Sequence, residues 1–389
     1  MKIPFIPLRL SIVAVLIPWL FLLSGCVSGK VATQKTSDAE KSRILSGSGL
    51  FQGPTPESHL PDDNVLMLTD EMKSFIDHAV SGYKGRDEKL KALLDAIVSP
   101  GTLGLKYDAE ATYTARDTFS RKSANCLSFS IMMISMLRYL GYEAQFNDVE
   151  VPPVWDLQND RIMVLFRHVN VMITGPGRDR EVIDFYMDEY NIHYPQNLIE
   201  DNVAVAQYYN NRGMEFLLQG NTTEAFRYLL KAVTINPDAP YIWVNLGALY
   251  RNSARLDEAE IAYRAALDID PNYYVAISNI ERVYREQGRD DRAEEFGQRA
   301  RYYRLRNPYY LYKLAVDSFL DHDYETALRD IRTAIRKYED EHRFHFLQGA
   351  IYKAMDRPEQ ARASFQKAIE LTSTQKQIDK YRRKIEQLM

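Results

Sequence analysis

The sequence is poor in cysteine, in net charge and in long apolar runs, and each shortage excludes a class of protein. Two cysteines among 389 residues exclude a fold held together by several disulfides. A net charge of −4 and a pI near 6.0 provide no basic surface for nucleic acid. The apolar run Leu10–Leu23, interrupted by Pro18, is too short for a comfortable membrane span. With 46% hydrophobic and 26% charged residues, the chain has the composition and length of a globular protein with two domains.

The apolar run follows a basic start and ends in Leu23-Ser-Gly-Cys26. It resembles the signal peptide of a bacterial lipoprotein, with residues 1–25 as the signal. The resemblance implies cleavage before Cys26, acylation of that cysteine and a membrane anchor without a transmembrane helix. Val27, where aspartate would imply retention in the inner membrane, implies the outer membrane facing the periplasm. The alternative is an uncleaved signal anchor. Residues 26–60, rich in Ser, Gly, Thr and Lys, are predicted to be a flexible tether.

The other cysteine, Cys126, lies where a helix should begin. Asn125 is a good N-cap, and Gly141 supplies a left-handed stop. Apolar residues follow at helical spacing: Leu127, Ile131, Ile134 and Leu137. In the first turn, unpaired N–H groups and the helix dipole favour a thiolate. Cys126 is therefore predicted to be a nucleophile; the alternative is a small buried hydrophobic residue.

Of the seven histidines, only His168 lies inside a strand-like run, Arg161–Ile173. Alternation places His168 on one face with Asn170 and Met172, and both faces are largely apolar. The strand should therefore be central in its sheet, with His168 as a polar residue in a covered layer. His193, beyond this region, is a rival candidate for the base.

A turn at residues 174–178 and a second strand, Glu181–Met187, follow. If the turn is a five-residue hairpin loop, Ile173 pairs with Asp179 and Asp184 faces His168. Paired Cβ atoms are roughly 4.5–5.5 Å apart, close enough for a carboxylate to fix an imidazole tautomer. A one-residue slip would destroy this pairing.

Cysteine at a helix start, then histidine and aspartate on neighbouring strands, resembles the transglutaminase-like superfamily. Its fold is the α+β papain-like core, here residues 61–200. The resemblance implies acyl transfer from an amide through a thioester, to water or an amine, without a cofactor or metal. Cys126 would be the nucleophile, His168 the general base and then acid, and Asp184 the orienting carboxylate. Asn125 departs from the better-known members. Its side chain and the Cys126 N–H are both candidates for the second oxyanion donor.

The rest of this domain has an irregular pattern of helices and strands. Helical spacing predicts helices over Asp70–Val80, Asp87–Val98 and Ala109–Phe119, and alternation predicts a strand over Glu143–Val149. Trp155 follows two prolines and either walls a substrate cleft or packs within its loop.

From residue 206 the chain repeats every 34 residues. Two columns of alanine carry the period: Ala225, Ala259, Ala293, Ala327 and Ala361, and Ala232, Ala266, Ala300, Ala334 and Ala368. This pattern resembles the tetratricopeptide (TPR) repeat, and implies an all-α solenoid of five repeats over 206–375 with a capping helix over 376–389. Such arrays bind a protein or peptide on the concave face of their first helices.

Three residues at one repeat position, Asn211, Asn245 and Asn279, could bind an extended peptide backbone. The alternative is that asparagine is simply common there. His342 and His345 have helical spacing but no third ligand, so a solvated helix face is predicted and no metal.

The sequence thus predicts a lipid-anchored thiol enzyme acting on peptide or protein amides, with repeats that hold its substrate or partner. Hydrolysis is favoured over transfer because no dedicated amine site is evident. The alternative is a non-catalytic scaffold in which an inherited core supports the repeats.

Overall fold

The structure, a computed structural model, describes most of the chain after residue 34. The described ranges are 35–47, 49–51, 60–110, 112–149, 168–175, 180–185, 194–372 and 375–386. Cys26, Trp155, His193 and residues 161–167 lie outside them. Within these ranges no helix is both long and apolar enough to cross a bilayer.

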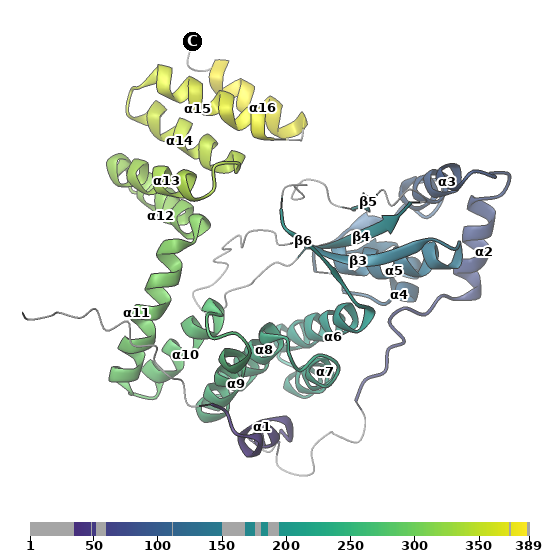
Figure 1. Cartoon of the computed structure of the whole chain (residues 1–389), viewed down its shortest axis with the longest axis horizontal. Coiled ribbons are helices and arrows are strands. Elements are labelled where there is room, and N and C mark those ends of the chain that lie inside the picture. The colour runs from purple at the N-terminus through teal and green to yellow at the C-terminus, as the bar shows by residue number, and fades with distance from the viewer. Residues whose placement is uncertain are drawn as a thin grey trace, which may run out of the picture. The chain divides into compact units, whose positions relative to one another are not determined.

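A four-stranded antiparallel sheet precedes the repeats, in the order β5-β4-β3-β6. Its strands are β3 (Glu143–Val149), β4 (His168–Thr174), β5 (Arg180–Ile183) and β6 (Gln196–Ile199). The predicted strand over Glu143–Val149 is confirmed, and β4 is an inner strand, as its two apolar faces predict. Helix α5 (Cys126–Tyr139) runs along the sheet (Figure 1). The papain-like character of this α and β arrangement stays a prediction.

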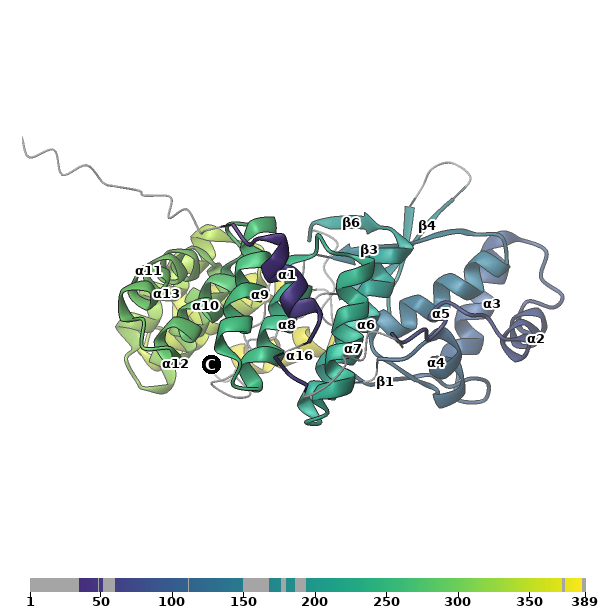
Figure 2. The ribbon, with the colours of Figure 1, turned by 90° about the horizontal axis from the view of Figure 1, so that it is seen from below.

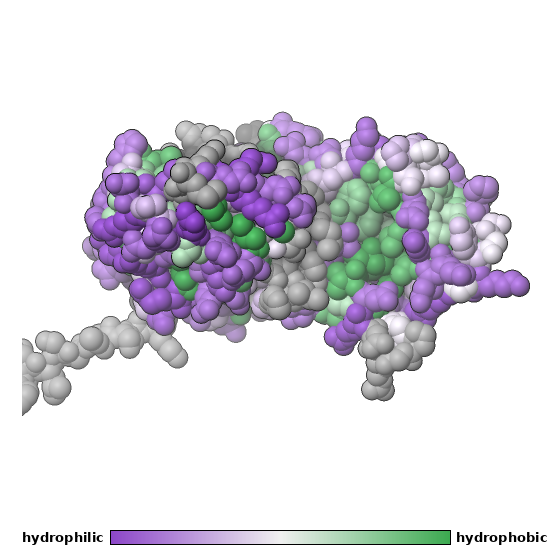
Figure 3. Space-filling view, turned by 90° about the horizontal axis from the view of Figure 1, so that it is seen from above, coloured by the Kyte–Doolittle hydropathy of each residue, from purple (hydrophilic) through white to green (hydrophobic). Residues whose placement is uncertain are grey.

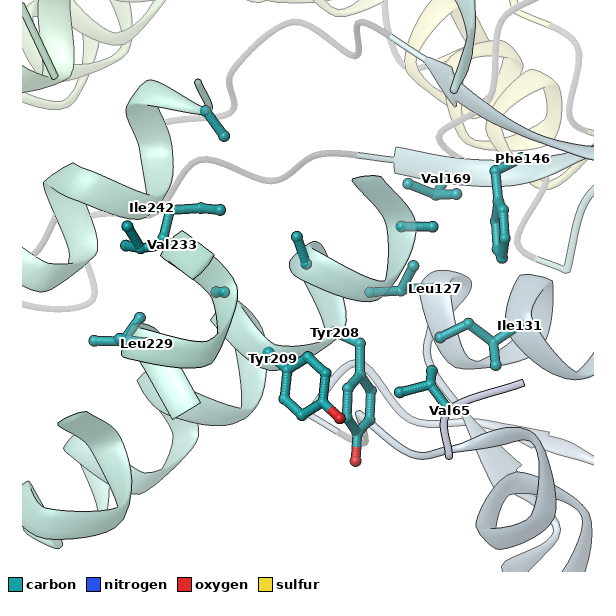
Figure 4. Packing of buried hydrophobic residues seen from close by; sticks show 14 of the residues in the cluster. Val65, Leu127, Ile131, Phe146, Val169, Tyr208, Tyr209, Leu229, Val233 and Ile242 are labelled. Atoms are coloured by element: carbon teal, nitrogen blue, oxygen red, sulfur yellow. The ribbon is translucent and has the colours of Figure 1, made fainter. Parts of the chain in front are cut away.

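Apolar residues of α5, β3 and β4 form the core that fixes the helix on the sheet. Figure 4 shows Leu127 and Ile131 of α5 beside Phe146 of β3 and Val169 of β4. Phe146 and Ile131 are fully buried, and burial of such a side chain stabilises the fold by about 1.5–3 kcal/mol. This packing brings the first turn of α5 next to the start of β4.

Three more helices and a short parallel strand pair pack on and around α5. They are α2 (Asp70–Ala79), α3 (Arg86–Val98), α4 (Ala115–Arg121), β1 (Lys106–Tyr107) and β2 (Ser123–Ala124). The prediction for α4, Ala109–Phe119, was wrong at both ends. Asp108 N donates to Ala124 O at 2.9 Å, which keeps the chain extended there. The helix begins only where the Thr114 hydroxyl caps it, accepting from Asp117 N at 3.1 Å.

The repeat region consists of five helix pairs and a final helix. They are α6 (Asp201–Leu218), α7 (Thr222–Ile235), α8 (Pro240–Asn252), α9 (Leu256–Ile269), α10 (Tyr274–Glu286), α11 (Asp290–Arg306), α12 (Pro308–Leu320), α13 (Tyr324–Lys337), α14 (His342–Ala354), α15 (Pro358–Leu371) and α16 (Gln375–Glu386). The alanine columns are buried, as close helix crossing requires. Gly247 shows how close: a Cβ there would lie 2.6 Å from Cε1 of Tyr263.

Among the described residues, the buried apolar side chains form two separate clusters. The first extends from Ile44 to Ala300 and includes both the sheet region and the first three repeats. The second extends from Tyr309 to Phe365. The apolar core of the repeats is therefore interrupted near α11, which is rich in charge and buries only Ala293, Phe296 and Ala300. Hydrophilic residues also cover most of the visible surface where Figure 1 draws α11 to α16 (Figure 3).

Part of the segment expected to be a flexible tether is a helix, α1 (Asp38–Leu45). Figure 2 shows it against α8 and α9. Ile44 is fully buried, its carbonyl accepts a bond from the Tyr250 hydroxyl, and Thr36 N donates to Asp268 Oδ2 at 2.9 Å. Ser37 and Glu40 form a capping box, and Glu40 pairs with Arg264. Because the helix is held mainly by polar contacts and by the single side chain of Ile44, its sequence shows almost no apolar periodicity. The apolar pattern therefore gave no sign of a helix here.

Candidate thiol site

The start of α5 is fixed by Asn125, as predicted. Its Oδ1 accepts a bond from Ser128 N at 2.8 Å, and its Nδ2 donates to the Thr112 hydroxyl at 3.0 Å. The side chain is thus occupied at both ends and buried, so it is a poor candidate for an oxyanion donor. The N–H of Cys126, in the first turn, has no acceptor within an ideal helix and is the better candidate.

Cys126 and His168 meet where α5 begins and β4 starts. The half-buried thiol and the imidazole are hydrogen-bonded neighbours. Ser130 supports this contact, because its hydroxyl lies 2.8 Å from Cys126 O and 3.0 Å from Val169 O. The first turn of the helix is therefore joined to the backbone beside His168.

Asp184 lies on the other side of the imidazole. His168 Nε2 is 2.5 Å from Asp184 Oδ2, and the two side chains are 8% and 1% exposed. Because Nε2 is bonded to the carboxylate, Nδ1 is the nitrogen that can exchange a proton with the sulfur of Cys126.

Electrostatics favour the protonated form of His168. Burial by itself lowers the pKa of this histidine, but the hydrogen bonds to Asp184 and Cys126 and the charges of both groups outweigh burial. They raise the pKa of His168 from 6.5 to about 10. The site therefore holds an imidazolium at neutral pH, between a carboxylate and a sulfur.

The strand register differs from the predicted one by two residues. Ile173 pairs with Glu181, not with Asp179, because the turn begins after Thr174. Since side chains alternate with a period of two, this shift keeps every residue on its expected face. Asp184 consequently lies opposite Asn170, which donates to its Oδ2 at 3.0 Å, and reaches His168 along the diagonal.

Two buried asparagines that the sequence reasoning left without a role extend this contact across the sheet. Asn147 Nδ2 donates to Asn170 Oδ1 at 2.7 Å and to Gln196 Oε1 at 3.0 Å. Asn147 and Asn170 are 0% and 1% exposed. Asp184, Asn170, Asn147 and Gln196 thus form a polar row from the end of β5 across β4 and β3 to β6. Asn170, two residues after His168 and on the same face, was the signal that the sequence offered. Its partners, Asp184 and Asn147, can be identified only once the strand register is known.

Phe185 fixes the chain immediately after Asp184. Its ring stacks on Phe129 of α5, with centroids 4.7 Å apart and planes 13° from parallel. The carboxylate is therefore held by the polar row on one side of its strand and by aromatic stacking on the other.

Replacing Asn170 by leucine should loosen the carboxylate and weaken its hold on the ring. We expect the pKa of His168 to fall from about 10 by about one unit, because a mobile Asp184 stabilises the imidazolium less. The measurement is a pH titration of the ¹³C-labelled histidine Cε1 by NMR. Met172→Leu, on the same face of β4 but outside the polar row, is the matched control. An unchanged titration in Asn170→Leu would show that the row does not position Asp184.

The first repeat contacts this site through Thr112. Besides receiving the bond from Asn125, Thr112 is hydrogen-bonded to Glu215 of α6. Burial raises the pKa of Glu215, against the opposing effects of Thr112 and Arg212. Thr112 therefore links Glu215 of α6 to Asn125, the residue that caps α5.

The three asparagines predicted to bind peptide lie on the first helices of repeats one to three and are half-exposed. Asn245 Nδ2 donates to Asn210 Oδ1 at 2.8 Å, and Asn210 Nδ2 lies 3.3 Å from Asn211 Oδ1. Asn211 and Asn245 are therefore linked through a buried neighbour. Peptide binding by Asn211, Asn245 and Asn279 stays a prediction.

The solvated helix face predicted for His342 and His345 was wrong. His345 is 7% exposed, and its Nε2 lies 2.7 Å from Glu339 O. His342 Nδ1 lies 2.8 Å from the Tyr381 hydroxyl of α16. Both rings are covered because α14 packs between the preceding turn and the final helix.

Comparison with known proteins places the recognised similarity in the repeats. Residues 206–239, 240–273 and 342–375 match models of the tetratricopeptide repeat, so these segments are TPR repeats. Anaphase-promoting complex subunit 3 of Schizosaccharomyces pombe is 30% identical over 125 residues, 32% of this chain. The chain spans about a fifth of that protein, 19%.

The solved structures that are similar at low identity include the following two. MamA from Desulfovibrio magneticus RS-1 is 20% identical, with a TM-score of 0.26 over 44% of this chain and 96% of that one. The pilF protein of Pseudomonas aeruginosa is 16% identical, with a TM-score of 0.27 over 49% and 94%.

Proposed function

We propose that Cys126, His168 and Asp184 form the active site of a thiol enzyme acting on peptide or protein amides, and that the TPR repeats bind its protein substrate or partner. The observation that carries the proposal is the position of His168, hydrogen-bonded to Cys126 and 2.5 Å from Asp184. A nucleophile, a base and an orienting carboxylate in contact is the arrangement that covalent acyl transfer requires.

In the first half of the reaction, the Cys126 thiolate attacks the amide carbonyl carbon and a C–S bond forms. The N–H of Cys126 donates to the developing oxyanion. As the C–N bond breaks, the imidazolium of His168 gives its proton to the leaving amine, and a thioester remains on Cys126. Asp184 holds the ring in place throughout.

In the second half, neutral His168 takes a proton from water as the oxygen attacks the thioester. The C–S bond breaks, the carboxylic acid leaves, and the thiolate and imidazolium are restored. An amine in place of water would complete a transfer. Hydrolysis is the proposed outcome because no dedicated amine site is evident. We further propose that a lipid on Cys26 anchors the enzyme in the bacterial envelope, at the outer membrane facing the periplasm.

A peptidyl vinyl sulfone that carries an alkyne tests the enzyme proposal, because it alkylates a thiolate placed in a substrate site. We expect labelling of the folded protein at Cys126, identified by peptide mass mapping, and none in Cys126→Ser. Protein unfolded in urea supplies the reference for an ordinary thiol. Equal labelling rates for folded and unfolded protein would refute the thiol-enzyme proposal.

A non-catalytic scaffold is the second candidate, and the position of the family matches favours it. The segments that match the repeat models lie after residue 205, and the curated relative is named as the subunit of a complex. A chromosomal Cys126→Ala strain separates the candidates. If the strain keeps the phenotype of the parent while disruption of the repeats abolishes it, the chain is a scaffold.

Replacing Asp184 by asparagine should change how stability depends on pH. The folded pKa of His168 is raised, so its contribution is full below the ordinary pKa of 6.5 and is lost as pH rises through about 10. Between these values we expect the wild-type free energy of unfolding to fall by about 1.4 kcal/mol per pH unit from this group. Asp184→Asn should flatten that slope. Urea unfolding across this pH range, compared with Asp117→Asn as a distant control, measures it, and identical slopes would contradict the ion pair.

A further inference from the structure

The third repeat reverses a packing pair that the matched repeats share. In those repeats a glycine on the first helix lies beneath a large side chain of the second helix. The pairs are Gly213 with Leu229, Gly247 with Tyr263, and Gly349 with Phe365, where a glycine Cβ would lie 2.7, 2.6 and 2.7 Å from the larger side chain. In the third repeat the corresponding residues are Glu281 and Gly297. A Cβ on Gly297 would meet only Cγ of Glu281, at 3.7 Å.

This reversal leaves a cavity of about 500 Å³ between α10, α11 and the start of α12, which we name the third-repeat pocket. It is lined by Glu281, Arg285, Glu294, Gly297, Gln298, Arg301, Arg304, Leu305, Tyr310 and Leu314. The size is that of a small-ligand or side-chain site. It also lies where the two apolar clusters are separated, between Ala300 and Tyr309.

The acidic residues of the pocket are already engaged. Glu281, 6% exposed, pairs with Arg285, and Glu294 accepts a bond from Gln298 Nε2 at 3.0 Å. Three guanidinium groups, on Arg285, Arg301 and Arg304, line the pocket against these two carboxylates, so the lining keeps a net positive charge.

Arg301 and Arg304 give the pocket its positive charge. In the described part of the chain, no ion pair within 4.0 Å engages Arg301, Arg304 or the neighbouring Arg282. Burial, followed by repulsion from Arg251 and Arg304, lowers the pKa of Arg282. Arg282 and Arg304 are partly buried and repel each other, and Arg301 is exposed beside them, so an added anion would be attracted by all three guanidinium groups.

We propose that the third-repeat pocket binds an acidic segment of a protein partner. Its carboxylate lies between Arg301 and Arg304, with added attraction from Arg282, and a neighbouring apolar side chain packs on Leu305 and Leu314. A bare phosphate ion would use the charge but leave the apolar wall empty. Neither the three asparagines nor the residues of the thiol site line the pocket, and the proposal does not depend on catalysis.

The test measures, by fluorescence anisotropy, how tightly the full chain binds a rhodamine-labelled octapeptide of alternating glutamate and leucine. Gly297→Phe fills the cavity, and we expect it to weaken binding at least about tenfold. Gly297→Ala is the matched control, because its Cβ makes only an ordinary contact and leaves the cavity open. Arg304→Gln should also weaken binding about fivefold or more, and raised salt should weaken wild-type binding.

The double variant Glu281→Gly/Gly297→Phe recreates the pair of the other repeats and should fold, as a thermal melt checks, without binding the peptide. Equal affinity of Gly297→Phe and Gly297→Ala would overturn the proposal. A second octapeptide, of alternating lysine and leucine, is the charge control, and the proposal would also be overturned if it bound as tightly as the acidic one. The same holds if inorganic phosphate bound to wild type and not to Gly297→Phe, while the acidic peptide did not bind.

Discussion

Replacing His168 by alanine is expected to slow alkylation of Cys126 by iodoacetamide about 100-fold near pH 6.5. The imidazolium beside the sulfur is the group that favours a reactive thiolate at this pH, and the raised pKa of His168 keeps it protonated there. Near pH 9.5 an ordinary thiol ionises without help, so the ratio of the two rates should shrink to a few-fold.

The measurement is the second-order rate across pH, followed by intact mass. His78→Ala is the matched control, because His78 is exposed on α2. A rate ratio that does not change with pH would mean that the imidazole affects access to the sulfur and not its ionisation.

Replacing Arg343 by methionine is expected to destabilise the second apolar cluster by about 3–5 kcal/mol at neutral pH. Glu341 is only 2% exposed and accepts bonds from Arg343 Nε at 2.8 Å and from the Tyr309 hydroxyl at 2.9 Å. Burial raises the pKa of Glu341, but the hydrogen bond and charge of Arg343 outweigh it and lower that pKa. Without the arginine, a buried carboxylate is left without its countercharge.

The pH dependence distinguishes this cause from lost packing. A lowered folded pKa stabilises the protein above the ordinary glutamate value of 4.5, and this contribution is lost on acidification. The difference between wild type and Arg343→Met should therefore shrink towards about pH 4, where the orphaned carboxyl takes up a proton. Urea unfolding at both pH values measures it. Arg329→Met, with an exposed arginine paired to Asp330, should change stability by less than about 1 kcal/mol.

The sequence was sufficient to predict that Cys126 starts a helix and that His168 and Asp184 share a face of neighbouring strands, because these features depend on local pattern. A helix cap, an inner strand and a turn are all encoded within a few residues. It was insufficient for the register. A two-residue shift leaves every side chain on the same face, so alternation cannot distinguish the predicted pairing of Ile173 with Asp179 from the observed pairing with Glu181.

The other differences arise from contacts between distant residues. Helix α1 depends on partners more than 200 residues away, such as Asp268 for Thr36. The reversed pair of the third repeat is invisible to the alanine columns, because Glu281 and Gly297 lie between them and preserve the period. In both cases the local sequence pattern does not reveal the structure, because contacts with residues distant in the sequence determine it.

The continuity of the first apolar cluster determines where this chain can be divided. A cut at the boundary suggested by the sequence, near residues 200–206, would separate Asp63 from Tyr208, whose hydroxyl donates to Asp63 Oδ2 at 2.8 Å. It would also separate Arg138 from Asp201, two residues joined by hydrogen bonds of 2.6 and 2.8 Å. A fragment ending there would lack part of its own interior. Limited proteolysis should instead release a piece that retains the first three repeats, cut close to Asn307, where the two clusters separate.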